Sequence, residues 1–593
     1  MIAAAVSPQN RPAAPANVAG TVMALLLFLL PLKFGGLSAM PEAAGFYPPL
    51  LSDWLYVAFP PHAVGIAGAY MLLWALLTRP QLPVRQTGLL LTWCVIPAVA
   101  ALPGIINGHS DESWGEISNL LGIGAFAAAA GIFIARDAVW GKRFAAALLL
   151  GGLCSAAYGI YQHFYGLTEL REYAAENLRK GLPVPKALQL KLQDPRVFST
   201  LASPNIFSSM LLLISPLAWY FAWEWGKKFA PEKVSRRLFG TLFFILIAAA
   251  LFFASSRSSL LCPLLAGMLA VFSLKKLKTS WRIAALAAAI LAVGIGAWFA
   301  IRHGRGLASM GERADYLRSA AVLTAKHPFS GGGWGNFFRT HREIKLSSTD
   351  ESARDPHNIV AAFASQAGVI PGILMLAVLI LPLCLLWKHR FTPGFPMAVF
   401  WSGVLFTLHS LMDCDWHSPA LPVTMGVLYF AACREVAPAE PPLKKSFYVT
   451  IILSALLAAS AGVNWHYLRR DMALAQLCDK LMPPTEEIAR NMAHLSVPQL
   501  AARAREVRPA SPVVWDLEGM WYRHNGNIPA AEKCFIKVLE LDPGRPDVLR
   551  KLAEIEAKKG NYDAAMQLIR QAQKKFPKHA RYNVEKFQQE FCR

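Results

Sequence analysis

Three basic side chains, Arg257, Arg313 and His357, lie where an apolar stretch of the sequence meets a polar one. Arg257 occupies the very short turn A-S-S-R-S-S-L, and Arg313 lies in E-R-A-D-Y-L-R, which has the spacing of an amphipathic helix. An ionisable side chain at the edge of a membrane is costly, so each arginine is a candidate ligand or catalytic group. Two other interpretations stay open: an interfacial arginine reaching to water, and a solvated Arg313 paired with Glu312 or Asp315.

His357 lies in D-P-H-N-I-V-A-A-F, between Asp355 and Asn358, where we expect the chain to return to the membrane. A neutral imidazole near physiological pH is a suitable general base. Three polar side chains in a second short turn could orient that base: Asp413, Asp415 and His417. The alternatives are a histidine that caps a helix and an acidic turn at the membrane surface.

The composition predicts that membrane helices position these side chains. Of the 593 residues, 54% are hydrophobic and 16% are charged, which excludes an ordinary soluble enzyme. Apolar runs long enough to span the hydrocarbon layer of a bilayer cross it as helices, so we predict an all-α, polytopic membrane protein. The sequence contains thirteen such runs: 17–33, 61–78, 87–106, 117–135, 144–165, 205–223, 238–254, 259–274, 283–300, 360–387, 395–412, 418–433 and 447–464.

Basic residues predict the orientation of these spans. With the N-terminus in the cytoplasm, loops on that side contain twenty Lys and Arg, whereas the short opposite loops contain only Lys33 and Arg257. The long segments 166–204 and 301–359, and the chain after residue 464, are then outside. We expect the first apolar run to be a retained span. Most of the net charge of +21 therefore reports orientation rather than a nucleic-acid partner.

A period of 34 residues appears in the C-terminal part. Gly526-Asn527 recurs as Gly560-Asn561, and Pro543 recurs as Pro577. The two units resemble tetratricopeptide repeats, and a degenerate third covers about 476–509. We therefore predict a transmembrane domain at 1–464 and a helical repeat domain at 465–593. Stacked helix pairs form a concave surface suited to a protein partner or an acceptor, and the alternative is a structural cap.

Other site chemistries have little support in the sequence. The nine cysteines form no CxxC pair and no metal-ligand spacing with histidine, so we predict neither a zinc site nor a disulfide scaffold. The run G-G-G-W-G allows close approach of an anion but lacks the GK[ST] of a nucleotide-binding loop. We therefore expect no metal, no cofactor and no nucleic acid.

Four stretches, in order, resemble the O-antigen ligase family of bacterial membrane glycosyltransferases, which includes O-linked protein oligosaccharyltransferases. They are D-P-R-V-F-S-T-L-A-S-P-N-I-F-S-S-M, A-S-S-R-S-S-L, E-R-A-D-Y-L-R-S-A-A-V-L-T-A-K-H-P-F-S-G-G-G-W-G-N-F and D-P-H-N-I-V-A-A-F-A-S-Q-A-G-V-I-P-G. In the last stretch, Gln366-Ala367-Gly368 stands where the family commonly has Glu-x-Gly.

The resemblance implies transfer of a glycan from undecaprenyl-diphosphate to an acceptor, lipid A core or protein, on the periplasmic face of the inner membrane, without metal. By the resemblance, Arg257 and Arg313 would hold the diphosphate, Arg196 and Asn205 would help on the donor side, and His357 would activate the acceptor hydroxyl. Three alternatives remain: a polymerase using the same donor, a lipid-glycan transporter and a scaffold. Few charges at span centres and no repeat of the spans disfavour the transporter.

Overall fold

The computed structural model describes most of the chain. The described residues are 14–36, 47–48, 50–55, 57–78, 82–107, 111–179, 192–201, 203–229, 232–274, 278–302, 307–346, 352–437, 446–483, 486–577 and 579–591. They are predominantly helical and form no β-strand, which confirms the predicted all-α class. Six of the predicted cytoplasmic cations lie outside the described residues, namely Arg11, Arg79, Lys275, Lys276, Lys444 and Lys445. So do residues 180–191, 202, 303–306 and 347–351 of the predicted outside segments.

Each of the thirteen predicted spans falls on helical structure. The helices concerned are α1 (Ala14–Lys33), α2 (His62–Leu77), α3 (Val84–Leu90) continuing through η3 (Leu91–Val95) into α4 (Ile96–Asn107), α5 (Asp111–Arg136), α6 (Val139–Tyr161) with η4 (Gln162–Gly166), α9 (Pro204–Phe229), α10 (Lys233–Ala254), α11 (Arg257–Ser273), α12 (Thr279–Arg302), α15 (Ile359–Ala367), α16 (Val369–Leu386) with η5 (Trp387–His389), α17 (Phe395–Ser410), α18 (Ala420–Val436) and α19 (Ser446–Leu481). Among the described residues, six helices are long and apolar enough to cross a membrane, and five more are apolar but shorter. The number of spans stays a prediction.

The run predicted at 360–387 is two helices rather than one. Gly368 ends α15 and begins α16 with φ +114°, a backbone conformation that residues with a side chain rarely adopt. A Cβ atom there would lie 2.6 Å from the carbonyl oxygen of Phe329, so the close approach of the outer loop also requires glycine. The break at Gly368 separates the short helix α15, with His357 just before it, from the longer apolar helix α16.

Helix α5 forms the centre of the bundle and packs against α2, α18 and α19. Residues 115–135 of this helix are all buried. Small side chains, such as those of Ala127 to Ala130, allow the neighbouring helices to approach closely. Polar residues gather at its outer end, where Asn119 donates to the carbonyl of Trp416 (2.7 Å). This contact fixes the turn between α17 and α18.

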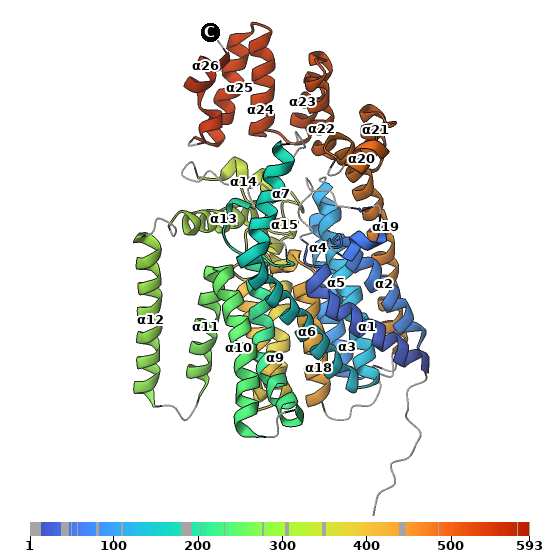
Figure 1. Ribbon diagram of the computed structural model, residues 1–593, viewed down its shortest axis with the longest axis vertical. Helices are drawn as coiled ribbons and strands as arrows, with labels where there is room; N and C mark the ends of the chain where they lie inside the picture. The colour runs from blue at the N-terminus through green and yellow to red at the C-terminus, as the bar shows by residue number, and fades with distance from the viewer. Residues whose placement is uncertain are drawn as a thin grey trace, which may run out of the picture.

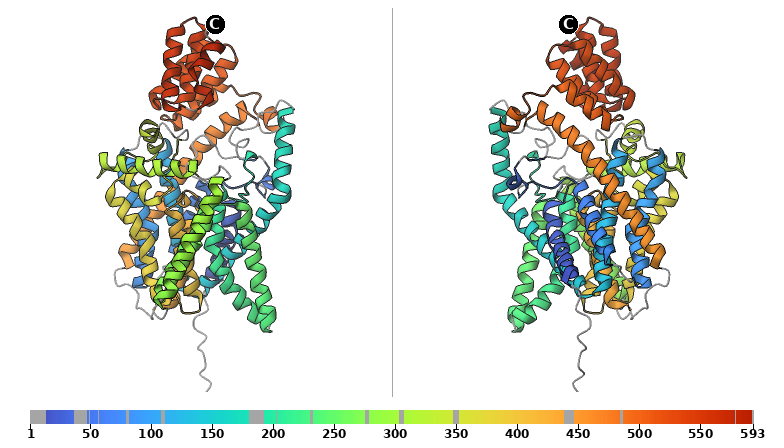
Figure 2. Two further views of the ribbon diagram at one scale, coloured as in Figure 1. Left: turned by 90° about the vertical axis from the view of Figure 1, so that its left-hand side faces the viewer. Right: turned by 90° about the vertical axis from the view of Figure 1, so that its right-hand side faces the viewer.

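The remaining elements lie mostly beyond one end of the bundle (Figure 1). These are η2 (Leu51–Leu55), α7 (Leu167–Arg179), α13 (Leu307–Lys326), α14 (Phe337–Ile344), η6 (Asp415–His417) and the C-terminal helices α20 (Glu486–Asn491), α21 (Val497–Val507), α22 (Pro512–His524), α23 (Ile528–Leu541), α24 (Pro546–Lys558), α25 (Tyr562–Lys575), η7 (Ala580–Tyr582) and α26 (Val584–Phe591). Figure 2 shows the repeats above α13 and α14 from both sides. The ends of α9, α11 and α18 near predicted cytoplasmic cations lie at the opposite end of the bundle.

The C-terminal helices pair in the manner of the predicted repeats. Helix α22 packs against α23, and α24 packs against α25. Ala531 and Ala565, which are related by the 34-residue period, are both fully buried at the helix contacts. Gly526 and Gly560 have φ values of +76° and +84°, as the turn within each pair requires. Helix α19 continues without interruption from the apolar stretch to Leu481, so it joins the bundle directly to the repeats.

Candidate active site

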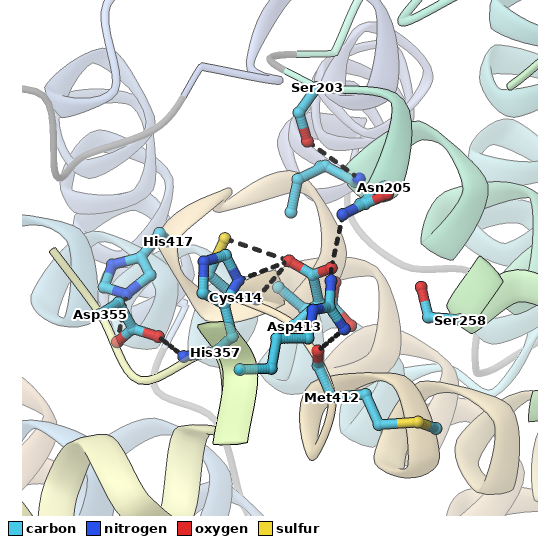
Figure 3. Close-up of polar contacts among 12 residues, drawn as sticks. Ser203, Asn205, Ser258, Asp355, His357, Met412, Asp413, Cys414 and His417 are labelled. Atoms are coloured by element: carbon cyan, nitrogen blue, oxygen red, sulfur yellow. Dashed lines mark hydrogen bonds and ion pairs between the residues drawn. The ribbon is translucent and has the colours of Figure 1, made fainter. Parts of the chain in front are cut away.

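Asp413 is the centre of a polar cluster at the outer edge of the bundle (Figure 3). Its carboxylate is only 2% exposed and accepts three hydrogen bonds from other segments. His357 Nδ1 lies 3.2 Å from Oδ1, while Arg313 Nη2 (3.0 Å) and Asn205 Nδ2 (2.7 Å) donate to Oδ2. Because a carboxylate only accepts, Nδ1 of His357 carries the proton and Nε2 faces away from Asp413. Four segments distant in sequence therefore meet at one carboxylate.

Arg313 is fixed by two hydrogen bonds to the turn between α17 and α18. One goes to Asp413, and Nη1 donates the other to the carbonyl of Met412 (2.7 Å). Tyr316, one helical turn further along α13, is buried and stacks on the ring of His357 with centroids 5.7 Å apart. Helix α13 thus supplies both the guanidinium and the surface against which the imidazole rests.

The backbone at His357 is in an unusual conformation, with φ +55°. Asp355 holds it there by accepting the N–H of His357 at 2.7 Å. Asn358 caps α15 by accepting from the N–H of Ala361 (2.9 Å) and donates to the carbonyl of Leu411 (2.8 Å). A left-handed backbone in a residue other than glycine costs free energy and persists where the surroundings impose it. The segment is therefore built to present His357 in one orientation.

Two other residues with side chains have a positive φ in the described part of the chain, Ser199 and Ser255. Ser199 follows Arg196 by three residues, and Ser255 precedes Arg257 by two. His357 is itself a candidate catalytic residue, and the other two positions lie next to candidate arginines. Such clustering is typical of functional sites.

His417 supports the loop that carries His357 instead of contacting its ring. Its Nε2 lies 3.0 Å from Asp355, and its Nδ1 lies 3.0 Å from Glu116 on α5. Burial alone would lower the pKa of His417, but the two carboxylates outweigh it and raise this pKa well above its ordinary value. A buried imidazolium therefore joins α5 to the segment before α15. Glu116 was not among the predicted site residues.

Arg196 and Arg257 lie outside the hydrogen bonds just described. The guanidinium of Arg196 forks onto Asp194, two residues earlier, with a shortest distance of 2.7 Å. Arg257 is the first residue of α11 and is exposed. Its neighbour Ser258 points into the bundle and is hydrogen-bonded to His409 Nε2 (2.9 Å). Arg257 is thereby placed by a buried contact one residue away.

The contact of Ser258 belongs to a series of buried hydrogen bonds that was not predicted from the sequence. His409 Nδ1 donates to Asp415 (2.9 Å), which also accepts from Ser209 (2.9 Å). The order Ser–His–Asp resembles a nucleophilic triad. However, His409 and Asp415 are completely buried and Ser258 nearly so, and this burial suits support of α11 better than attack on a substrate. A histidine inside an apolar run was the available signal, since such residues are rare in membrane helices.

Charge within the cluster sets the protonation of its members. Burial alone would raise the pKa of Asp413, but His357, His409 and Arg313 lower it below its usual range. Burial would likewise lower the pKa of His357, yet Asp413, and to a smaller degree Asp355, raise it above 6.5. The pair combines an ionised carboxylate with an imidazole more basic than usual.

The G-G-G-W-G run has a structural role. The N–H groups of Gly332 and Gly333 donate to the carbonyls of Ser365 (2.9 Å) and Gln366 (3.0 Å). The N–H of Gly335 donates to the Gln366 side chain at 3.1 Å. These donors are therefore used within the fold, and Gln366 has a structural contact where the family commonly has glutamate.

His357, Asp413 and Cys414 bring three potential metal-ligand atoms within 4.8 Å of one another. Burial and the neighbouring carboxylates raise the pKa of the Cys414 thiol well above its usual value, which disfavours the thiolate that a metal requires. Arg313 already supplies a positive charge to Asp413. The donor set therefore suits hydrogen bonding better than metal binding.

The fold and the cluster together define a polytopic helical membrane protein with a polar centre at its outer edge. Residues 242–377 match the O-antigen ligase family model, and residues 522–584 match a tetratricopeptide repeat model. These matches confirm the resemblance and indicate a membrane glycan ligase or transferase that carries repeats typical of protein interaction. The first match includes Arg257, Arg313 and His357 but not Asp413. The chain has no significant match among curated proteins.

Proposed function

We propose that this chain transfers a glycan from undecaprenyl-diphosphate to an acceptor hydroxyl at the periplasmic face of the bacterial inner membrane. The observation that carries the proposal is the placement of Arg313 and His357 on the two oxygens of Asp413. The guanidinium of Arg313 suits an anionic leaving group, and the imidazole of His357 suits removal of a proton. Their shared carboxylate fixes the distance between these two functions.

His357 is the proposed general base. Asp413 holds the proton on Nδ1, so the lone pair of Nε2 is directed at the acceptor. The acceptor oxygen forms a bond to the anomeric carbon of the glycan while the bond from that carbon to the diphosphate oxygen breaks. The acceptor proton passes to Nε2, and undecaprenyl-diphosphate leaves with the electron pair. Asp413 stabilises the imidazolium that results.

Arg313 and Arg257 are the proposed ligands of the diphosphate, with Arg196 and Asn205 on the donor side. Negative charge grows on the leaving oxygen in the transition state, and fixed guanidinium groups stabilise it without reorganising. Arg257 is the first residue of α11, where the helix dipole also favours an anion. We propose that these cations replace a metal ion. Asp355, Asn358, Asp413 and His417 orient the base.

The expected pH dependence follows from the His357–Asp413 pair. We expect kcat/KM to fall as the pH drops through the raised pKa of His357, because the base must be unprotonated. Replacing Asp413 with asparagine removes the largest influence that raises this pKa, so the acidic limb should move to lower pH while the maximal rate decreases. Initial rates between about pH 5 and pH 9 measure both effects. An acidic limb at the same pH in both proteins would contradict the pairing.

The location of the repeats supports the proposed sidedness. The buried pair between Arg342 of segment 301–359 and Asp542 of the repeat domain requires both on the same side of the membrane. We expect a reporter fused after residue 593 to be active in the periplasm and inactive in the cytoplasm. As the matched control, the same reporter fused after residue 437, which follows α18, should report the cytoplasm. The reverse pattern would overturn the orientation.

The whole reaction can be tested with the purified chain in lipid vesicles. An undecaprenyl-diphosphate glycan is offered with lipid A core, with acceptor protein or alone, and both glycan transfer and released undecaprenyl-diphosphate are measured. Transfer to either acceptor supports the proposal and identifies the acceptor. Lengthening of the lipid-linked glycan instead supports the polymerase alternative. Movement of the donor across the bilayer without chemical change would overturn both.

A further inference from the structure

The repeat domain contacts the outer loop of the membrane domain through a buried ion pair. Asp542 follows the last residue of α23, and Arg342 Nη2 donates to it at 2.9 Å. The two side chains are only 2% and 7% exposed, so the pair is shielded from water. Arg339 approaches the same carboxylate at 3.8 Å. Two cations of α14 therefore meet one acidic side chain of the repeats.

Further contacts surround this pair. Lys345 Nζ lies 4.3 Å from the ring centroid of Phe576. The guanidinium groups of Arg342 and Arg354 lie 4.7 and 5.5 Å from the ring centroid of Phe338. A partly open cavity of about 30 Å³ lies beside the pair, and Glu116, Arg339 and Asp542 are among the residues that line it. The ion pair and the contact of Lys345 with Phe576 thus join α14 to the repeats.

Helix α14 is in turn joined to the residues that meet at Asp413. His341, next to Arg342, is completely buried; its Nδ1 is 3.0 Å from Ser319 Oγ on α13. Its ring meets the ring of Tyr316 edge to face at 5.2 Å, and Tyr316 stacks on His357. The contacts therefore run without a gap from Asp542 through α14 and Tyr316 to His357.

A second connection holds the far end of α14. Asp315 on α13 accepts from the N–H of Leu346 (3.0 Å) and from Arg318 Nε (2.9 Å). Asp315 lies two residues after Arg313, so the same turn of α13 carries the proposed diphosphate ligand and the anchor for α14. A displacement of α14 would disturb both halves of the proposed site.

We propose that the repeat domain is a positioning part of the active site, with Asp542 and Arg342 as its positioning residues. This inference rests on the proposed role of His357. The ion pair holds α14, and α14 holds Tyr316, which supports His357. The domain then determines the rate of the chemical step in addition to any partner that its concave surface binds.

The test measures transfer by the full chain in vesicles, together with amide hydrogen exchange of residues 337–346. We expect Asp542→Ala to increase exchange in α14 and to lower kcat by up to about 100-fold, because small displacements of a catalytic group have effects of this size. The KM values for donor and acceptor should change little. Asp563→Ala, an exposed acid of the same domain, is the matched control and should behave as the unmodified chain.

The exchanged pair Asp542→Arg with Arg342→Asp should recover part of the lost kcat, which a general loss of folding would not permit. Unchanged kcat in Asp542→Ala despite faster exchange in α14 would overturn the inference. An effect confined to the acceptor KM would also overturn it, because the domain would then only recruit the acceptor. A fully active His357→Ala variant would instead overturn the proposed function, while the exchange data would still test whether Asp542 holds α14 in place.

Discussion

Replacing His357 with alanine should lower the rate of glycan transfer by about 10²- to 10⁴-fold, the usual contribution of a general base. The acceptor hydroxyl would then have to lose its proton to water. Donor binding should be nearly unchanged, since Arg313 keeps its two hydrogen bonds to Met412 and Asp413. The measurement is the initial rate in vesicles at saturating donor, alongside donor affinity.

The matched control for this variant is His327→Ala. His327 is an exposed histidine at the end of α13, in the same outer segment as His357. Its removal should leave both rate and donor affinity unchanged. Thermal unfolding of the two variants distinguishes loss of the base from loss of the fold. Near-normal turnover in His357→Ala would exclude His357 as the base.

Replacing Arg313 with alanine should weaken donor binding and lower kcat by about 10²- to 10³-fold, the cost of removing one fixed donor from a developing anion. Arg313→Lys should recover only part of this loss, because an ammonium cannot reach Met412, Asp413 and a phosphate with the geometry of a guanidinium. Arg257→Ala should weaken donor binding in the same way.

Lys326→Ala, which removes an exposed cation from the last turn of the same helix, controls for the change in overall charge. Donor affinity is measured directly with labelled undecaprenyl-diphosphate glycan, and the rate is measured in the same vesicles. If both arginine variants keep the affinity and the rate of the unmodified chain, the diphosphate is bound elsewhere. If an Arg313 variant loses rate but keeps its donor affinity, this side chain stabilises only the transition state.

The helices were predictable from the sequence because their signal is local. An apolar run long enough to cross a bilayer must satisfy its own backbone hydrogen bonds, so it is helical wherever it lies. The 34-residue period is equally local, and the matching repeat model and the packing of α22 to α25 confirm it. The division of 360–387 into α15 and α16 was missed because hydropathy does not report the backbone angle of Gly368.

The types of the site residues were also visible in the sequence, whereas their arrangement was not. Arg313 and His357 were selected because ionisable groups at a membrane edge are expensive, and Asp413 was selected because it could orient the base. Nothing in their spacing indicated that Asp413 lies between the other two, or that His417 contacts Asp355 instead of His357. Contacts between residues far apart in the sequence, such as Asn205 and Asp413 at 208 positions, depend on how whole helices pack.

The sequence by itself therefore determined the class of protein, its helices, its repeats and the types of the candidate site residues, since hydropathy, charge and periodicity act over short stretches of chain. Only the tertiary structure decided which carboxylate pairs with which cation, how Ser258 is held by His409, and where the repeats rest. The ion pair of Arg342 with Asp542 illustrates the reason. Each residue alone resembles an ordinary surface charge, and only packing brings the two together out of water.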